Sequence, residues 1–291
     1  FLVSGLAFSS EFTPCSGINL NNKTKVSFNR ILLAKSIDGI NFERKKQILV
    51  DRASVPDVMV DKNGKVRVYF VIIGCQEKNM NNNPVVAISP DNGDSWKYHR
   101  LNIEAPIDGK KCKEPFGSPP PVDPEVILTT EGKYRLFATC PNSSMNKETP
   151  MTFMFESDDG INFKNGKLAF KPNKGFALDP VVLQIKKEWI MINGNMGPAK
   201  SIDGKFFKSE KFDLFCPYEF KNISNGKKQC YIVGDALYDM SKETYRMYLF
   251  SDKENNYFKS VMSKDGINWK IEQSETEFLL KNEIDKNLEY Y

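Results

Sequence analysis

The stretch SPDNGDSW, residues 89–96, decides the fold of this 291-residue chain, because the same pattern recurs four more times. The other copies are SIDGINF (36–42), SDDGINF (157–163), SIDGKFF (201–207) and SKDGINW (263–269). Asp and Asn side chains accept hydrogen bonds from backbone amides two residues on, and Gly takes a positive φ. We therefore predict that each copy, called a box below, is a structural hairpin turn without a role in chemistry. Its closing aromatic residue is expected to pack between strands.

Further patterns repeat between the boxes, and each is typical of a short strand. The first is an apolar segment opened by an aspartate: PDVMVD (56–61), DPEVIL (123–128), DPVVLQI (179–185) and GDALYD (234–239). The second alternates with aromatic residues: GKVRVYFV (64–71), GKYRLFA (132–138), EWIMIN (188–193) and TYRMYLF (244–250). A third strand leads into the box and a fourth follows it. Many short strands between Gly and Asn turns predict an all-β fold, and repeated four-stranded units predict a β-propeller.

We expect one domain over residues 1–291 with five blades of four antiparallel strands. The N-terminal part supplies only the last two strands of the first blade, FNRILLAKS (28–36) and NFERKKQILV (41–50). The other two strands come from residues 1–20 or from the C-terminal stretch SETEFLLKNEID (274–285), or they are missing. Residues 1–10 are either an inner strand or the remnant of a signal peptide.

Composition and charge exclude several classes of protein. The chain has 41 basic and 37 acidic residues, which are interspersed, so no basic face for nucleic acid is expected. No apolar run is long enough for a membrane span. The single histidine, His99, argues against a histidine base or a multi-histidine metal site. Six cysteines and three glycosylation sequons, at Asn22, Asn142 and Asn222, favour a secreted or extracellular protein, which we expect to be a monomer.

The cysteines fall in segments that a propeller gathers on one face. Cys216 and Cys230 would close one connection, and Cys75 or Cys140 would pair with Cys112. Sequence does not determine disulfide connectivity, so these pairings are hypotheses. The alternative is six free thiols in a reducing compartment.

Four aspartates open the first strands of successive repeats: Asp57, Asp123, Asp179 and Asp235. By symmetry they should surround one end of the propeller axis. Clustered carboxylates repel, so one can be held protonated by its neighbours. Glycoside hydrolysis needs such an acid and base, which inverting enzymes hold roughly 6.5–9.5 Å apart. Two alternatives stay open: the aspartates cap nearby backbone amides, or they hold a Ca²⁺ on the propeller axis.

Other polar and aromatic residues are candidates for binding a carbohydrate. Glu114 and Glu219 lie in loops that precede first strands, and Glu125 shares the side of its strand with Asp123. Trp189 is an aromatic residue of the kind that suits a sugar face. The alternative for the loop residues is an ordinary surface role. Three arginines repeat at one position of the second strand, and we expect them to pair with neighbouring blades: Arg67, Arg135 and Arg246.

The boxes and strands together resemble known propellers. SPDNGDSW is similar to the Asp-box of sialidases. From about residue 28 to 270, three motifs follow one another in the order Asp-Pro-x-Val, Gly-x-Tyr-Arg and Ser-x-Asp-Gly-x-x-Phe/Trp. This order resembles the five-bladed propellers of glycoside hydrolase families 43, 32, 62 and 68. The resemblance implies that Asp57 is the base, that Asp123 or Asp179 tunes its pKa, and that a Glu is the acid. That Glu has no clean match, because the fourth repeat carries Asp235. The Arg-Ile-Pro motif of sialidases is missing.

We therefore expect a secreted glycan-processing enzyme. It would be a glycoside hydrolase that uses acid and base carboxylates in the central funnel of the propeller, with no cofactor unless Ca²⁺ binds on the axis. The alternative is a non-catalytic propeller that binds a glycan or a protein through the same face.

Overall fold

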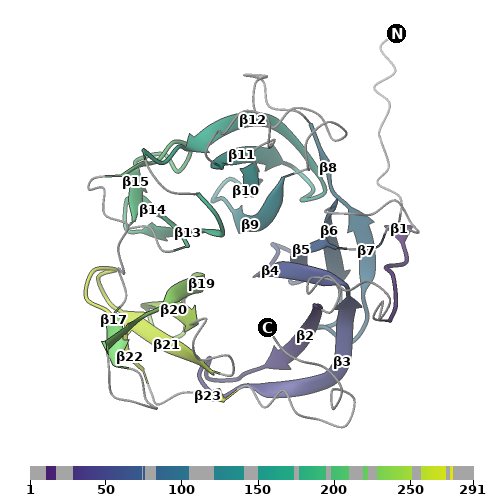
Figure 1. Ribbon diagram of the computed structural model, residues 1–291, viewed down its shortest axis with the longest axis horizontal. Helices are drawn as coiled ribbons and strands as arrows, with labels where there is room; N and C mark the ends of the chain where they lie inside the picture. The colour runs from purple at the N-terminus through teal and green to yellow at the C-terminus, as the bar shows by residue number, and fades with distance from the viewer. Residues whose placement is uncertain are drawn as a thin grey trace.

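Every regular element in the described part of the chain is a β-strand. The computed structural model describes residues 11–17, 29–73, 75, 83–104, 121–140, 150–173, 177–194, 198–209, 219–221, 228–250, 257–272 and 276–277. The strands form small sheets arranged around a central axis (Figure 1). The chain is thus all-β and a β-propeller, as predicted.

Four sheets of four or five strands form the blades. Blade 1 contains β4 (Ala53–Val60), β5 (Val66–Ile72), β6 (Asn83–Ser89), β7 (Lys97–Arg100) and β1 (Glu11–Phe12). Blade 2 contains β9 (Val122–Leu128), β10 (Tyr134–Cys140), β11 (Met151–Ser157), β12 (Asn162–Phe170) and β8 (Asn102–Ile103). Blade 3 contains β13 (Pro180–Ile185), β14 (Glu188–Asn193), β15 (Ala199–Ser201) and β16 (Lys208–Ser209). Blade 4 contains β19 (Ile232–Asp239), β20 (Thr244–Phe250), β21 (Tyr257–Ser263), β22 (Lys270–Ile271) and β23 (Thr276–Glu277).

The predicted count of five four-stranded blades is corrected by the structure, whose described residues form four blades. Between blade 4 and blade 1 lies a sheet of only two strands, β2 (Arg30–Lys35) and β3 (Glu43–Asp51) (Figure 1). The described segments expected to complete it pair elsewhere: β1 pairs with β7 at the outer edge of blade 1, and β23 pairs with β21. A separate hairpin is formed by β17 (Glu219–Lys221) and β18 (Lys228–Cys230).

Each box forms a hydrogen-bonded turn before the last strand of its sheet. In the box 157–163, the Ser157 hydroxyl donates to the Asp159 carboxylate at 2.9 Å, and the Gly160 amide donates to Ser157 Oγ at 2.9 Å. The Asn162 amide donates to the same carboxylate at 2.8 Å. Equivalent bonds join Ser36 to Asp38, Ser89 to Asp91, Ser201 to Asp203 and Ser263 to Asp265. The carboxylates of the boxes are therefore occupied by local structure.

The repeated arginines join neighbouring sheets, as expected. Arg67 in β5 donates to the Asp159 carbonyl of the next box at 2.8 Å. Arg135 in β10 donates to the Asp203 carbonyl at 3.0 Å, and Arg246 in β20 donates to the carbonyl of Gly39. The guanidinium groups therefore fasten each of these blades to the following box.

We expect Gly160→Ala to destabilise the protein by about 2–4 kcal/mol, because it combines backbone strain with a clash. Gly160 has φ +72°, and an added Cβ would lie 2.6 Å from Arg67 Nη1 and 2.7 Å from Tyr69 Oη. Gly64→Ala is the matched control, because Gly64 has φ +74° and nothing within 4 Å of the added atom. Its expected cost is about 1 kcal/mol, from backbone strain alone. Equal losses in urea unfolding would contradict the packing of Arg67 over this turn.

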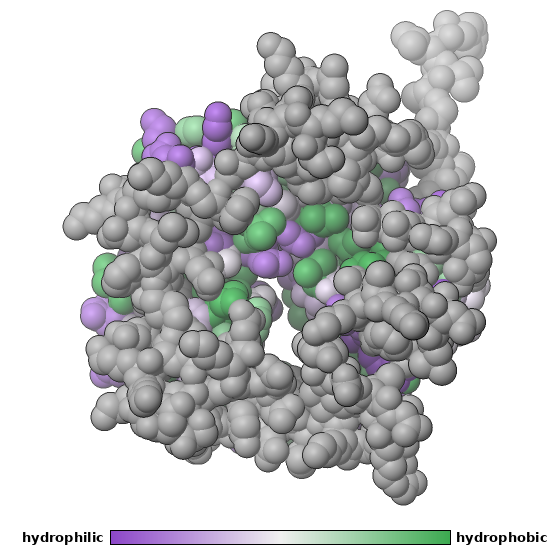
Figure 2. Space-filling view, viewed as in Figure 1, coloured by the Kyte–Doolittle hydropathy of each residue, from purple (hydrophilic) through white to green (hydrophobic). Residues whose placement is uncertain are grey.

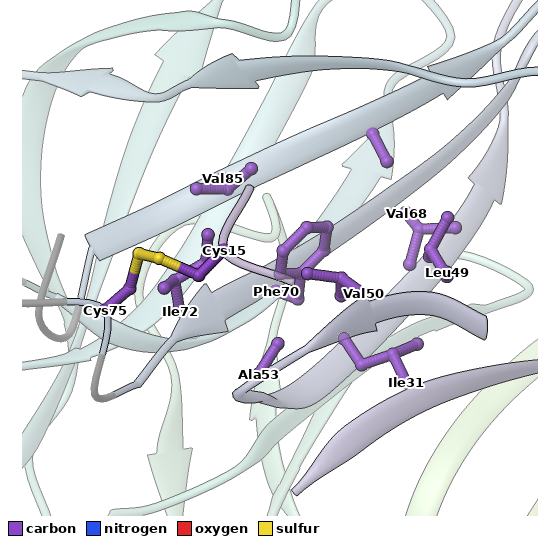
Figure 3. Packing of buried hydrophobic residues seen from close by; sticks show 11 residues of the cluster. Cys15, Ile31, Leu49, Val50, Ala53, Val68, Phe70, Ile72, Cys75 and Val85 are labelled. Atoms are coloured by element: carbon purple, nitrogen blue, oxygen red, sulfur yellow. A yellow bond between two sulfur atoms is a disulfide. The ribbon is translucent and has the colours of Figure 1, made fainter. Parts of the chain in front are cut away.

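The core between the β2–β3 sheet and blade 1 contains a disulfide, Cys15–Cys75 (Figure 3). Both half-cystines are buried beside Val85 and Ile72. Of the two predicted partners of Cys112, Cys75 is therefore wrong, and Cys140 stays a prediction. A pairing across 60 residues of sequence carries no local signal, which is why spacing alone missed it. Cys140 is also disulfide-bonded.

Several expectations concern residues outside the described part of the chain. These are the three sequons at Asn22, Asn142 and Asn222, and the cysteines Cys112 and Cys216. Within the described residues, no helix has the length and apolar character needed to cross a membrane.

Candidate functional site

The first strands of the four blades, β4, β9, β13 and β19, lie nearest the axis (Figure 1). The surface is hollowed at the centre of the ring, where hydrophilic and hydrophobic residues both surround the opening (Figure 2). These strands therefore border the central opening.

Three carboxylates meet at the axis, and their oxygen atoms all lie within 4.8 Å of one another: Asp57, Glu125 and Asp235. We call them the axial trio. They come from β4, β9 and β19, three different blades. They occupy equivalent positions in the three repeats. In the pairing of the first and second strands, each is the partner of the residue two positions after the repeated arginine: Asp57 pairs with Tyr69, Glu125 with Phe137, and Asp235 with Tyr248. The symmetry of the fold thus builds the trio.

The structure separates the four aspartates that were predicted to share one ring. Asp57 and Asp235 belong to the trio, but Asp123 and Asp179 stand two residues earlier, each followed by a proline. The equivalent triplets are Val55-Pro56-Asp57, Asp123-Pro124-Glu125, Asp179-Pro180-Val181 and Val233-Gly234-Asp235. Alignment on the proline instead of the aspartate would have given this register. Blade 3 then contributes an apolar residue, Val181, at the position of the trio.

An irregular backbone places these side chains. Val55, Asp123 and Asp179 have φ of 50°, 52° and 47°, although none is glycine. Register shifts follow between Ser54 and Asp57 in β4 and between Val233 and Asp235 in β19. Such a bulge re-aims the side chain that follows it. The shared irregularity turns the trio toward the axis.

Backbone amides hold the trio in position. The Val126 amide donates to Asp57 Oδ2 at 2.8 Å, and the Val182 amide donates to Glu125 Oε1 at 2.9 Å. Both bonds cross to the next blade along the ring. Asp235 Oδ1 instead accepts the amide of its own neighbour, Ala236, at 2.6 Å. Of these three hydrogen bonds, only the one to Asp235 stays within a single strand.

Burial and mutual repulsion favour the protonated forms of the trio. Burial raises the pKa of Asp57 well above its usual value, and the Asp235 carboxylate adds to the effect. Burial is the main cause that raises the pKa of Glu125, and repulsion from Asp57 and Asp235 raises it further. Burial raises the pKa of Asp235 to about 7. The trio therefore retains protons near neutral pH while keeping acceptor oxygens.

Asp123 and Asp179 form a second, outer pair. The Asp179 amide donates to Asp123 Oδ2 at 3.4 Å. Burial raises the pKa of Asp123. The pKa of Asp179 is raised to about 6 by the protein atoms around it and by Asp123. Asp179 is nevertheless exposed to solvent, which weakens such effects by screening.

The predicted binding residues separate in the structure. Glu125 joins the trio and is 6 % exposed. Trp189 does not: its ring lies 6.0 Å from the Arg135 guanidinium, and a Cβ on Gly204 would meet it at 2.7 Å. It therefore packs where blades 2 and 3 meet. Glu219 begins β17, which pairs with β18 and with none of the four blades, and Glu114 lies outside the described residues.

The donor set of the trio also fits a divalent cation. Ca²⁺ takes oxygen ligands at about 2.3–2.6 Å, so two ligands on opposite sides of one ion lie about 5 Å apart. Three carboxylate oxygens within 4.8 Å of one another satisfy this limit. Among the described residues, blade 3 supplies Val181 and no further carboxylate at this level.

We expect stability to fall as pH rises from about 4 to 7 when a chelator is present. A carboxyl whose pKa is about 7 in the folded state and about 4 when unfolded binds more protons folded in this range. Stability is then fully present below the unfolded pKa and is lost as pH rises through the folded pKa. Asp235→Asn should reduce the loss by about 1–3 kcal/mol. Urea unfolding of both proteins at several pH values measures it, and parallel pH profiles would contradict it.

Comparisons with known proteins support the fold. No family model matches the chain, and no curated protein matches it. A thermostable family-43 glycoside hydrolase has a similar structure, with TM-score 0.57 and 12 % identity over 84 % of this chain and 86 % of that one. A family 117 glycoside hydrolase of the marine bacterium Zobellia galactanivorans gives TM-score 0.53 and 16 % identity over 84 % and 75 %. An N-acetylgalactosamine deacetylase from F. plautii, solved with blood group B trisaccharide, gives 0.56 and 14 % over 84 % and 74 %.

At these identities the likeness establishes the fold alone. The chain is a β-propeller of the kind found in glycoside hydrolases of families 43 and 117.

Proposed function

We propose that this protein is a secreted, monomeric glycan-processing enzyme, a glycoside hydrolase whose acid and base come from the axial trio. The observation that carries the proposal is the meeting of Asp57, Glu125 and Asp235 within 4.8 Å at the propeller axis. Buried carboxylates with pKa values pushed upward are what acid and base catalysis at neutral pH requires. The propeller neighbours include glycoside hydrolases, which supports a carbohydrate substrate.

Each member of the trio has a distinct place in the proposed mechanism. Asp235 has a pKa of about 7, so it can donate a proton to the leaving oxygen of the glycosidic bond. Asp57 is assigned the ionised role because the Val126 and Val58 amides favour its carboxylate form, against the burial and the Asp235 charge that raise its pKa. Glu125 is 6 % exposed, and burial together with the charges of Asp57 and Asp235 raises its pKa, so it stays neutral beside the reacting pair. Asp123 and Asp179 would contact the sugar at the entrance.

The spacing favours a retaining reaction over an inverting one. Retaining glycosidases hold their two carboxyl groups about 5–5.5 Å apart, whereas inverting enzymes need roughly 6.5–9.5 Å to admit a water. Oxygens within 4.8 Å of one another are close to the first value. Asp57 as a nucleophile therefore has more support than Asp57 as the base that the family resemblance implies, a resemblance that left retention or inversion open.

The short distances between the trio carboxylates also favour a second candidate function. In a non-catalytic propeller, the trio would hold Ca²⁺ and the surrounding face would bind a glycan or a protein. Each trio carboxylate already accepts a backbone amide, which is the arrangement of a structural ion site as much as of a catalytic one. Calcium should then raise the melting temperature and a chelator should lower it.

The experiment that tests the proposal is a hydrolysis screen of the purified chain. It uses aryl glycosides and plant, fungal and animal glycans, with and without Ca²⁺, and measures released sugar. Release from any member supports an enzyme, and the anomeric form of the first product separates retention from inversion. No release from any substrate, together with glycan binding on an array, would replace the enzyme by the binding propeller.

A further inference from the structure

A cavity lies between the β2–β3 sheet and blade 1, which are neighbours in the ring (Figure 1). Its volume is about 440 Å³, within the range of roughly 300–1,000 Å³ that small-molecule sites occupy. Residues of β2 and β3 line it from one sheet, and residues of β4 and β5 line it from the other. The box 89–96 supplies Asn92, Gly93 and Trp96. We call this space the junction cavity.

The junction cavity exists because inner strands are missing from one of its two sheets. At the other four boxes, a side chain of a first or second strand covers the glycine of the turn. A Cβ added to that glycine would meet the side chain at less than 3 Å: Arg246 at Gly39, Arg67 at Gly160, Trp189 at Gly204 and Ile185 at Gly266. At Gly93 the nearest atoms belong to Trp96 of the same box, at 3.2 Å, and to Lys45 Nζ, at 3.9 Å. The described part of the β2–β3 sheet has no inner strand to supply a cover, so space is left here.

The walls of the junction cavity are mainly apolar. Five side chains form them: Leu33, Val58, Val66, Val68 and Trp96. Val58 is 53 % exposed although it belongs to an inner strand of blade 1. Removing such a side chain from water is favourable, so the walls favour a ligand with an apolar body.

The polar part of the lining is cationic. Among the described residues, the lining contains two lysines, Lys35 and Lys45, and no acidic residue. Both ammonium groups lie near one carboxylate outside the lining, since Asp94 Oδ1 is 2.8 Å from Lys45 Nζ and 3.9 Å from Lys35 Nζ. Contact with Lys45 lowers the pKa of Lys35, as expected for two cations that crowd each other.

The carboxylates nearby neutralise this ammonium pair only in part. Asp94 is shared by both lysines, and its side chain is 71 % exposed to water. Asp91 accepts the hydroxyl groups of Ser89 and Ser95 within its own turn. A monoanionic group in the junction cavity would therefore relieve the repulsion between the two lysines.

We propose that the junction cavity binds a small amphipathic acid. Its carboxylate would contact the two lysines, and its apolar body would lie against the valines and Trp96. The site is separate from the axial trio, because Val58 and Asp57 are adjacent in β4 and adjacent side chains of a strand point to opposite faces. The proposal therefore goes beyond sugar hydrolysis and does not depend on it.

The first test titrates the purified chain with octanoate in a calorimeter, beside octan-1-ol and octylamine as neutral and cationic probes of equal length. We expect octanoate to bind at least about tenfold more tightly than either, because charge-assisted hydrogen bonds to the lysines are made only by the acid. Affinity should rise about fourfold with each methylene from hexanoate to octanoate. Equal affinity for octanol and octanoate would overturn the role of the lysines, and no binding of any probe would overturn the site.

A pair of matched variants places the bound acid in the junction cavity. Val58→Trp fills the cavity and should weaken octanoate binding at least about tenfold, since the ligand loses its space. Val60→Trp is the control, because Val60 lies on the same strand, is 61 % exposed and is not part of the lining. Both positions are more than half exposed, so both variants should keep the melting temperature. Full binding in Val58→Trp would overturn the proposal.

A second pair tests the lysines. Lys35→Met should weaken octanoate binding at least about fivefold and leave octanol binding unchanged. Lys35 is chosen because Lys45 also donates to the Gly93 carbonyl at 3.1 Å and supports the box. Lys46→Met is the control, since Lys46 is exposed and follows Lys45 on the opposite face of β3. Equal losses in the two variants would overturn the carboxylate contact. None of these readouts uses sugar hydrolysis, so they succeed or fail separately from the glycan screen.

Discussion

Replacing Asp57 by asparagine is expected to lower kcat/KM for glycan hydrolysis by about 10²–10⁴-fold, the usual contribution of a positioned acid or base. The change is nearly isosteric, and the asparagine carbonyl can still accept the Val126 amide that now reaches Asp57 at 2.8 Å. The fold should therefore persist. Loss of the charge removes a repulsion that raises the pKa of Glu125, so the pKa of Glu125 should fall in the variant.

Asp179→Asn is the matched control for Asp57→Asn, because it makes the same chemical change in the outer pair. Asp179 is exposed and lies outside the trio, so we expect a rise in KM with little change in kcat. The measurements are kcat, KM and the melting temperature of both variants, which separate a catalytic role of Asp57 from a structural one. Full activity in Asp57→Asn together with inactive Asp179→Asn would move the chemistry to the outer pair. A large loss of melting temperature in Asp57→Asn would make its role structural.

Much of the architecture could be predicted from the sequence because the repeat is local. The box needs only Ser, Asp and Gly at fixed spacing, and the hydrogen bonds of Ser157, Asp159 and Gly160 follow that spacing. The role of the arginines followed from their repeated place in the second strand. The blade count did not, because the repeat predicts a unit but cannot show that β2 and β3 stand without inner partners.

The site was predicted in part, and its error has a physical cause. Asp57 and Asp235 were expected at the axis, whereas Glu125 was expected among the carbohydrate-binding residues. Asp123 and Asp179 attract attention because Asp-Pro commonly opens a strand, yet the positive φ at both residues shifts the register before the strand begins. A two-residue slip keeps the same face of a strand but moves the side chain along it. A sequence pattern of period two cannot detect that slip.

Arg246→Met is expected to destabilise the protein by about 3–5 kcal/mol, as the loss of one partner of a buried ion pair does. Arg246 is 1 % exposed, and its Nη2 lies 2.9 Å from Glu272 and 3.3 Å from Asp239. Methionine fills much of the volume but leaves the Glu272 carboxylate, 7 % exposed, without its guanidinium. The same change removes the bond to Gly39 that fastens blade 4 to the β2–β3 sheet.

Lys133→Met is the control, since the Lys133–Asp158 pair has side chains 54 % and 69 % exposed at 3.7 Å and should contribute less than about 1 kcal/mol. Adding Glu272→Gln to Arg246→Met should recover part of the loss, because it neutralises a buried carboxylate that keeps only Lys242 as an ion-pair partner among the described residues. Urea unfolding of the four proteins measures these differences. If Arg246→Met costs no more than Lys133→Met, the contact between blade 4 and the β2–β3 sheet does not hold the ring closed. If the double variant recovers nothing, the loss comes from the Gly39 contact and not from the buried charge.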